Sequence, residues 1–263
     1  MTPLDRLHAA LGDMGEVAVA VSGGIDSLTL ATAAHRARPG GVTMHHATSP
    51  AVPPEATART RVLAAAEGWP LDVFDAGEFA DPAYRANPVN RCFFCKTSLY
   101  GAVASRTRRQ IVSGTNMDDL GEYRPGLDAA RAHRVRHPFV EAGINKRTVR
   151  ALAAELGLGA LAELPSAPCL SSRIETGIRI EAPMLATVHA AETLVAARLS
   201  PRTVRCRVRA SGVVIELDPA ALAAVDAADG LRAEVQRLAD AAGLPAPVRF
   251  AAYRNGSAFL VPA

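Results

Sequence analysis

The 263-residue chain has little net charge, a formal +3 that results from 29 basic and 26 acidic residues. This small excess does not predict strong nonspecific binding to nucleic acid, although local basic clusters can still occur. The chain also lacks any apolar run of the roughly 20 residues that a membrane-spanning helix needs. We therefore expect neither a nucleic acid nor a membrane as partner.

The N-terminal sequence MTPLDRLHAALGDMGE lacks the uninterrupted apolar segment of a secretory signal. We therefore expect a cytoplasmic protein, whose thiols are normally kept reduced. Cysteine is scarce, with four residues in the whole chain, and we expect ligands, reactive groups or core residues rather than disulfides. The 49% hydrophobic content is enough to bury a large core, in one large domain or two smaller ones.

Two common nucleotide-binding motifs are missing as well. A Walker loop needs GxxxxGK followed by Ser or Thr, and the dinucleotide fingerprint needs GxGxxG. The first glycine-rich turn of the chain is instead SGGIDS, residues 22–27. It follows the apolar run 17–21, which predicts a buried parallel strand, and a helix is predicted from Asp26. Backbone N–H groups at the start of a helix favour an anion such as phosphate.

Strand-like and helix-like segments alternate through the first part of the chain. The predicted strands are 17–21, 42–47, 71–75 and 110–113, and the predicted helices lie near 26–37, 54–67, 93–106 and 146–157. This alternation predicts an α/β fold with a doubly wound parallel sheet, whose ligands bind at the carboxyl ends of the strands. The segment 116–144 is predicted to be an extended loop over the active site.

The pattern changes after about residue 180. A helix over 184–199 is followed by predicted strands at 203–209, 212–217 and near 247–253. We predict two domains, an α/β domain over 1–180 and a smaller α+β domain over 181–263 that binds substrate or forms oligomer contacts.

The SGGIDS turn resembles the pyrophosphate-binding (PP) loop of the ATP pyrophosphatases, which have an adenine nucleotide alpha hydrolase-like fold. In this interpretation, Ser22, Gly23, Gly24 and Ser27 hold the pyrophosphate of ATP and Asp26 holds Mg²⁺. A glycine-rich turn that Asp26 caps, without a ligand, is the alternative.

A second turn strengthens the resemblance. In QIVSGTNMDD, four residues resemble the second nucleotide-contacting turn of that superfamily: Gly114, Thr115, Asn116 and Asp118. The segment with Pro138 and Lys146 before a helix also resembles the superfamily, although a surface amphipathic helix would have the same pattern.

Two of the cysteines form a CxxC motif. Cys92 and Cys95 in RCFFCK can face one point from a loop or a first helical turn, and such a pair can be redox-active, bind zinc or hold part of an iron–sulfur cluster. Cys169 lies in APCLSSRI, in a predicted loop whose polar context argues against an inert core thiol.

In this order, the motifs SGGIDS, NRCFFCK, GTNMDD with YRPG, and APCLSSRI resemble the LarE family of sulfur transferases, over nearly the whole chain. The resemblance implies that ATP with Mg²⁺ adenylates the carboxylates of a nicotinate-derived mononucleotide, pyridinium-3,5-biscarboxylate mononucleotide. These become the thiocarboxylates of the nickel-pincer cofactor of lactate racemase. It also implies a sulfide donor and a homo-oligomer.

The family has two chemical variants. In one, a cysteine at the position of Cys169 attacks the acyl-adenylate and gives up its own sulfur. In the other, this cysteine and a CxxC pair hold a 4Fe-4S cluster that carries an extra sulfide. Because Cys92, Cys95 and Cys169 are all present, the chain resembles the cluster variant. A zinc site with three thiolates is the alternative.

The strand-like VRCRVR adds three further residues. Arg205 and Arg207 share one face of a strand, and the resemblance implies that they bind the phosphate of the substrate near Cys169. The alternative is that both arginines lie at a solvated strand edge and bind no ligand, because this arrangement has the same sequence pattern. Alternation turns Cys206 inward, and we predict a packing role for it rather than a fourth ligand. Glu192 on the preceding helix is a candidate for Mg²⁺ or subunit contacts, or an exposed helical acid.

Two other functions fit parts of the pattern. A tRNA thiolation enzyme would combine the same ATP chemistry with an RNA base, but the chain has neither a strongly basic composition nor an obvious RNA-binding appendage. A nucleotide-sensing module with a structural metal would use the turn and the cysteines without catalysis. Release of pyrophosphate separates an enzyme from a sensor.

Overall fold

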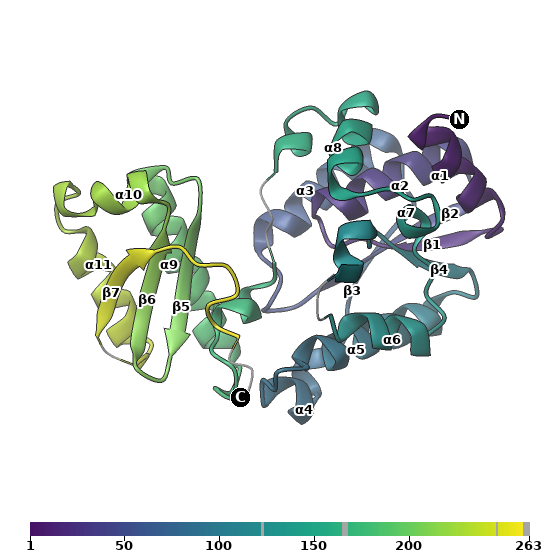
Figure 1. Ribbon diagram of the computed structural model, residues 1–263. Coiled ribbons are helices and arrows are strands. Elements are labelled where there is room, and N and C mark those ends of the chain that lie inside the picture. The colour runs from purple at the N-terminus through teal and green to yellow at the C-terminus, as the bar shows by residue number, and fades with distance from the viewer. Residues whose placement is uncertain (122–123, 165–167, 246, 260–263) are drawn as a thin grey trace. The chain divides into compact units, whose positions relative to one another are not determined.

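The computed structural model describes residues 1–121, 124–164, 168–245 and 247–259 (Figure 1). Its contacts divide the chain into two compact units. Unit 1 comprises Met1–Asp81 and Asn90–Ala167, and unit 2 comprises Pro82–Val89 and Pro168–Ala263. We predicted a boundary after residue 180 between a nucleotide-binding domain and a smaller domain that binds substrate or forms oligomer contacts. That division by function stays a prediction.

Unit 1 contains a four-stranded parallel sheet in the order β3-β2-β1-β4. Its strands are β1 (Val17–Ala20), β2 (Val42–Thr48), β3 (Leu71–Asp75) and β4 (Gln110–Ser113). All three pairings are parallel, and Val17 lies opposite both Val42 and Gln110. The predicted α/β class with a parallel sheet is confirmed.

Helices cover both faces of this sheet, as Figure 1 shows. The helices of unit 1 are α1 (Pro3–Gly12), α2 (Ile25–Ala37), α3 (Pro54–Glu67), α5 (Arg91–Arg106), α6 (Gly126–Ala132), α7 (Pro138–Glu141) and α8 (Lys146–Glu155). Short 3-10 helices are η1 (Glu78–Ala80), η2 (Met117–Gly121) and η3 (Gly159–Glu163). In the view of Figure 1, α1, α2 and α8 lie above the sheet and α5 and α6 below it.

The residues of β1 explain this double covering. All four are buried, and they alternate between two hydrophobic clusters. Val17 and Val19 pack with residues of α1, α2 and α8, whereas Ala18 and Ala20 pack with residues of α5 and α6. A strand that is apolar on both faces needs a layer of helices on each side.

The order of the strands creates a switch point in the sheet. The chain runs outward from β1 through β2 to β3, and then returns to place β4 on the other side of β1. In open α/β sheets, ligands bind beyond the carboxyl ends of the strands where the winding reverses. This point lies between β1 and β4, which the SGGIDS and GTN turns follow directly.

The segment 116–144 is not the extended loop that we predicted. Among its described residues it contains η2 and the helices α6 and α7. Buried apolar residues explain the ordered structure, because Ala130 packs with α5 and Phe139 packs with α1 and α8. Predicted loop residues 122–123 lie outside the described residues.

Unit 2 has a smaller sheet of three strands in the order β5-β6-β7. These are β5 (Val204–Arg209), β6 (Gly212–Leu217) and β7 (Val248–Ala252), with β5 and β6 antiparallel and β6 and β7 parallel. Its helices are α4 (Pro82–Arg85), η4 (Leu170–Arg173), α9 (Ala182–Leu199), α10 (Pro219–Ala223), η5 (Val225–Ala227) and α11 (Leu231–Ala241). The predicted smaller α+β region is confirmed.

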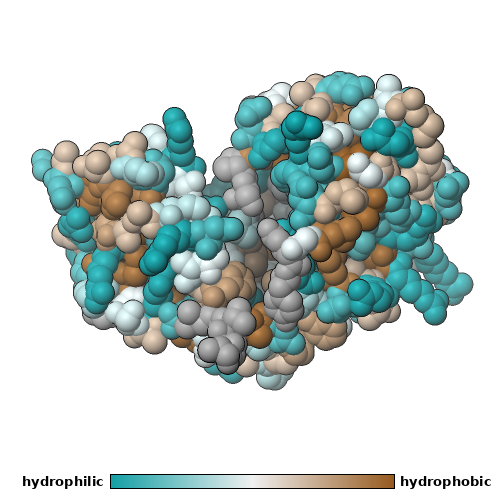
Figure 2. Space-filling view, in the orientation of Figure 1, coloured by the Kyte–Doolittle hydropathy of each residue, from teal (hydrophilic) through white to brown (hydrophobic). Residues whose placement is uncertain are grey.

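Hydrophilic and hydrophobic residues are interspersed on the surface of each unit in the face that Figure 2 shows. Across the described parts of the chain, no helix combines the length and apolar character that crossing a membrane would require.

Candidate functional site

The turn between β1 and α2 has a conformation that requires glycine. Gly23 has a φ of +78°, which disfavours other residues, and a Cβ there would lie 2.6 Å from the backbone oxygen of Ala56. Two serines close the turn: Ser27 Oγ accepts from the backbone N–H of Ser22 at 3.0 Å and donates to Gly24 O at 3.0 Å. The turn is therefore held in shape by its own hydroxyl groups.

Helix α2 begins at this turn with Gly24 as its N-cap residue. Within the described chain, no side chain caps this helix end. The first N–H groups of the helix thus have no side-chain acceptor, and together with the positive end of the helix dipole they favour an anion. Ser22 is exposed beside them, as a phosphate ligand must be.

The second turn packs directly against the first. A Cβ on Gly114 would lie 2.8 Å from Ser27 N and 2.9 Å from Asp26 C. The chain after β4 can approach the first turn of α2 this closely only because residue 114 has no side chain. Thr115 follows, and its hydroxyl is 3.0 Å from that of Ser113. Two segments about 90 residues apart in the sequence therefore form one site.

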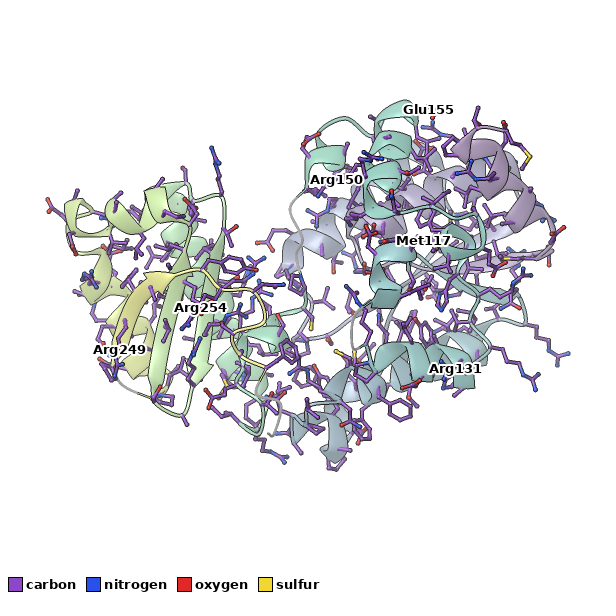
Figure 3. All side chains as sticks on the ribbon, viewed as in Figure 1. Met117, Arg131, Arg150, Glu155, Arg249 and Arg254 are labelled. Carbon is purple, nitrogen blue, oxygen red and sulfur yellow. The ribbon has the colours of Figure 1, made fainter. Side chains whose placement is uncertain are left out.

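Asp26 lies at the centre of this site. Its carboxylate forms an ion pair with Lys146 and accepts a long hydrogen bond from Asn116 Nδ2, at 3.4 Å. Asp118 accepts from the backbone N–H of Lys146 at 3.0 Å and so fixes the start of α8. In Figure 3, Met117 of η2 lies just below α8, which carries the labelled Arg150. Because its carboxylate contacts Lys146 and Asn116, Asp26 does not cap the glycine-rich turn, which was the alternative to a ligand-binding role.

Two residues that the sequence analysis missed support the turn from β2 and α3. His46 is fully buried, with Nδ1 2.8 Å from Val21 O and Nε2 2.9 Å from the hydroxyl of Thr57. Burial lowers the pKa of His46, so the neutral ring donates from Nδ1 and accepts at Nε2. Arg59 Nε donates to Gly23 O at 2.9 Å. No local motif indicates either role.

Replacing Gly114 by alanine tests the close packing of the two turns. We expect Gly114→Ala to lower the free energy of unfolding by about 1–3 kcal/mol, because the new methyl group must displace backbone atoms. It should also weaken ATP binding. Thermal unfolding and calorimetric titration with ATP measure both effects. The control is Gly12→Ala, where a Cβ meets open space. Unchanged stability and ATP affinity would contradict the packing argument.

The cysteines differ in their surroundings, and all four are free cysteines. Cys92 and Cys95 are half-buried in the first turns of α5, where a spacing of three places them on one side of the helix. Cys169 is half-buried at the N-cap position of η4. Cys206 is buried on β5 among the core residues of unit 2, and burial raises the pKa of its thiol. The predicted inward packing of Cys206 is confirmed.

Cys92 and Cys95 belong to unit 1 and Cys169 belongs to unit 2. No group of three or more His, Cys, Asp or Glu side chains arranged for a metal occurs within either unit's described residues. The shared cluster therefore stays a prediction.

A buried ion pair fixes the turn that contains Cys169. Arg173 forms two hydrogen bonds with Glu192, at 2.9 and 3.0 Å, and also donates to Cys169 O at 3.1 Å. Glu192 in turn accepts from the backbone N–H of Cys206 at 2.8 Å. Glu192 is only 9% exposed, so the interpretation as an exposed helical acid is wrong. Its sequence neighbours are helical and could not reveal a partner on another segment.

Arg205 and Arg207 share a strand but have different environments. Arg207 is 4% exposed, and it donates to Glu216 at 3.0 Å and to Ser172 O at 3.0 Å. Arg205 is half-buried, with its guanidinium 6.0 Å from the ring centre of Tyr253. Burial, together with Arg173, lowers the pKa of Arg205. Arg205 is thus better placed than Arg207 to receive a ligand.

Together, these observations define a class: a doubly wound α/β protein with a glycine-rich turn, at the start of a helix, at the switch point of its sheet. No protein-family model matches the chain. It is 34% identical over 220 residues to an uncharacterised protein of Synechocystis sp., a match that covers 82% of this chain and 81% of that protein.

The chain is also 32% identical over 219 residues to the pyridinium-3,5-bisthiocarboxylic acid mononucleotide synthase of Lactiplantibacillus plantarum. The match covers 81% of this chain and 79% of the synthase. A match over 93 residues, 32% identical, covers 34% of this chain and 36% of an uncharacterised protein of Methanocaldococcus jannaschii. The chain therefore belongs to the LarE family, the family of this synthase.

Proposed function

We propose that this protein is an ATP-dependent sulfur transferase that makes the thiocarboxylates of the nickel-pincer cofactor of lactate racemase. Its substrate would be pyridinium-3,5-biscarboxylate mononucleotide, in agreement with the name of the relative from Lactiplantibacillus plantarum. The observation that carries the proposal is the meeting of two turns, at Ser27 and Gly114, around the carboxylate of Asp26.

The first step is adenylation of a substrate carboxylate. The N–H groups at the start of α2 and the hydroxyl of Ser22 bind the pyrophosphate portion of ATP. Asp26 supplies an oxygen ligand for Mg²⁺, which when bound neutralises the phosphates. The carboxylate attacks the α-phosphorus and pyrophosphate leaves. The resulting mixed anhydride carries AMP, a far better leaving group than oxide.

The second step replaces AMP by sulfur. A sulfur nucleophile attacks the activated carbonyl carbon, AMP leaves and a thiocarboxylate remains. Cys92, Cys95 and Cys169 are half-buried thiols, the donor type that a 4Fe-4S cluster takes. The buried Cys206 does not fit this set. Such a cluster, when bound, supplies a place to hold sulfide until the carboxylate is activated.

Anaerobic reconstitution with iron and sulfide, followed by an assay with ATP and the dicarboxylate mononucleotide, tests the function. We expect release of AMP and pyrophosphate, and more than one thiocarboxylate per protein chain. ATP cleavage that requires tRNA instead of the mononucleotide would indicate a tRNA thiolation enzyme. Binding of ATP without pyrophosphate release in either case would indicate a sensor, and both results would overturn the proposal.

The two arginines of β5 should respond differently to replacement. We expect Arg205→Ala to weaken binding of the mononucleotide roughly tenfold and to leave ATP binding unchanged, because a charged hydrogen bond to phosphate is lost. Arg207→Ala should lower the free energy of unfolding by about 2–3 kcal/mol, since it leaves the carboxylate of Glu216 buried with fewer partners. Calorimetric titration and denaturant unfolding measure these effects. Equal losses of both ligands in Arg205→Ala would mean that this residue is structural.

A further inference from the structure

Helix α3 packs directly against the glycine-rich turn that follows β1. A Cβ on Gly23 would lie 2.6 Å from the backbone oxygen of Ala56, so this helix leaves no room for a side chain on the turn. Three positions further along α3, Arg59 contacts the same glycine, and its Nε donates to Gly23 O at 2.9 Å. Both segments belong to unit 1. The guanidinium group of Arg59 therefore lies at the SGGIDS turn.

Most of the hydrogen-bonding capacity of this guanidinium group is unused. The bond to Gly23 takes one of five N–H donors, which a guanidinium holds in a rigid, planar fork. Among the residues that the structure describes, the side chain of Arg59 has no other hydrogen-bond acceptor and no carboxylate within ion-pair distance. The Nη1 and Nη2 atoms are therefore free to bind a ligand at the turn.

The environment of Arg59 favours an anionic ligand. The side chain is half-buried, and burial lowers its pKa, while the carboxylate of Glu55 acts in the opposite direction. An arginine nevertheless stays charged at neutral pH, because its ordinary pKa is so high. Partial removal of a charge from water costs free energy unless an opposite charge is near. A bound anion would supply that charge.

The SGGIDS turn itself contains no cation. In a Walker loop, a lysine of the loop pairs with the phosphates of the nucleotide, and no lysine occurs between Ser22 and Ser27. Lys146 lies near the turn but forms an ion pair with Asp26. The start of α2 supplies only the helix dipole, equivalent to roughly half an elementary charge. A guanidinium group beside Gly23 provides the full positive charge that the turn lacks.

We propose that Arg59 binds the β- and γ-phosphates of ATP and stabilises pyrophosphate as it leaves. This role rests on the proposed function of the turn. When the substrate carboxylate bonds to the α-phosphorus, the bond from this phosphorus to the bridging oxygen breaks, and its electron pair moves to pyrophosphate. Negative charge thus grows beside the turn, where a cation already held in place by Gly23 O lowers the barrier.

Binding of pyrophosphate and of AMP, each with Mg²⁺, tests the contact. We expect Arg59→Gln to weaken the binding of pyrophosphate roughly tenfold, because a charged hydrogen-bonding fork is lost. Binding of AMP should not change, since AMP has no β- or γ-phosphate. With saturating ATP and mononucleotide, release of pyrophosphate should fall roughly 100-fold. Calorimetric titration and a pyrophosphate assay measure these effects.

Arg59→Lys separates a phosphate contact from support of the turn. Lysine keeps the charge but loses the fork, so its affinity for pyrophosphate should fall severalfold and remain above that of Arg59→Gln. If Arg59 only holds Gly23 O, both variants lose the same hydrogen bond and should bind pyrophosphate equally weakly. If Arg59→Gln does not fold, a loss in Arg59→Lys that is confined to pyrophosphate supports the contact, and unchanged affinity refutes it.

The matched control is Arg131→Gln, which removes an equal charge from unit 1. Arg131, labelled in Figure 3, is exposed on α6 and pairs with Asp128 on the surface. This variant should bind pyrophosphate as the wild-type protein does. Circular dichroism and thermal unfolding show whether each variant is folded.

The outcomes separate this inference from the proposed function. If folded Arg59→Gln binds pyrophosphate as tightly as the wild type, or if Arg59→Gln and Arg59→Lys lose affinity equally, the phosphate contact is wrong. Cleavage of ATP by the wild-type protein would then leave the proposed function intact. A wild-type protein that binds neither ATP nor pyrophosphate would refute the proposed function of the turn, and the role of Arg59 with it.

Discussion

Asp26→Asn is expected to reduce release of pyrophosphate from ATP by at least about 100-fold, because it removes the charge that would bind Mg²⁺ beside the phosphates. The replacement keeps the size of the side chain and its contact with Asn116. Asp26 and Lys146 are both partly exposed, and ion pairs of this kind contribute little to stability. The fold should therefore remain intact. Pyrophosphate release in the presence of the mononucleotide measures the effect.

The matched control is Asp128→Asn, which removes a carboxylate of unit 1 that pairs with Arg131 on the surface. This variant should cleave ATP at the wild-type rate. Circular dichroism and thermal unfolding of both variants show whether the protein is folded. If Asp26→Asn retained the wild-type rate of pyrophosphate release, the assignment of the SGGIDS turn would be wrong.

The second large effect concerns the three half-buried cysteines. We expect Cys92→Ala, Cys95→Ala and Cys169→Ala each to lose most of the reconstituted iron and the broad visible absorbance, because three protein ligands leave no redundancy. Cys206→Ala should keep both, since its thiol is buried in the core of unit 2. Metal analysis and absorbance of the four variants under anaerobic conditions provide the measurement.

Two other mechanisms predict different results for the same proteins. If Cys169 gives up its own sulfur, only Cys169→Ala blocks transfer, and the wild-type protein loses about the mass of H₂S after one turnover. If the cysteines bind zinc, the protein contains stoichiometric zinc and has no visible absorbance. A colourless, iron-free anaerobic protein that still turns over would contradict the cluster.

The fold of unit 1 could be predicted well from local patterns. All four strands of its sheet were predicted to within one residue of their observed ends, because apolar runs bounded by glycine and polar residues have few other stable structures. The SGGIDS turn was predicted for a similar reason. Its conformation depends on Gly23, whose positive φ is a local property of the residue itself.

Pairings between distant segments could not be predicted in this way. Glu192 looks like any helical acid until the fold buries it against Arg173, and Arg207 looks like a ligand until Glu216 pairs with it. The helices in 116–144 form for the same reason, because their apolar residues are few and become ordered only through contacts with α1, α5 and α8. The free energy of such contacts depends on burial, which a local pattern does not contain.

The sequence by itself thus determined the parallel sheet, the position of the glycine-rich turn and the inward direction of Cys206, since each depends on residues within one turn or strand. Only the tertiary structure decided that Gly114 packs against Ser27, that Lys146 meets Asp26, and that the segment with Tyr84 and Asn87 belongs with Cys169. Those contacts join segments about 80 to 120 positions apart in the chain. Their formation depends on the order and winding of the strands and on buried polar groups finding partners.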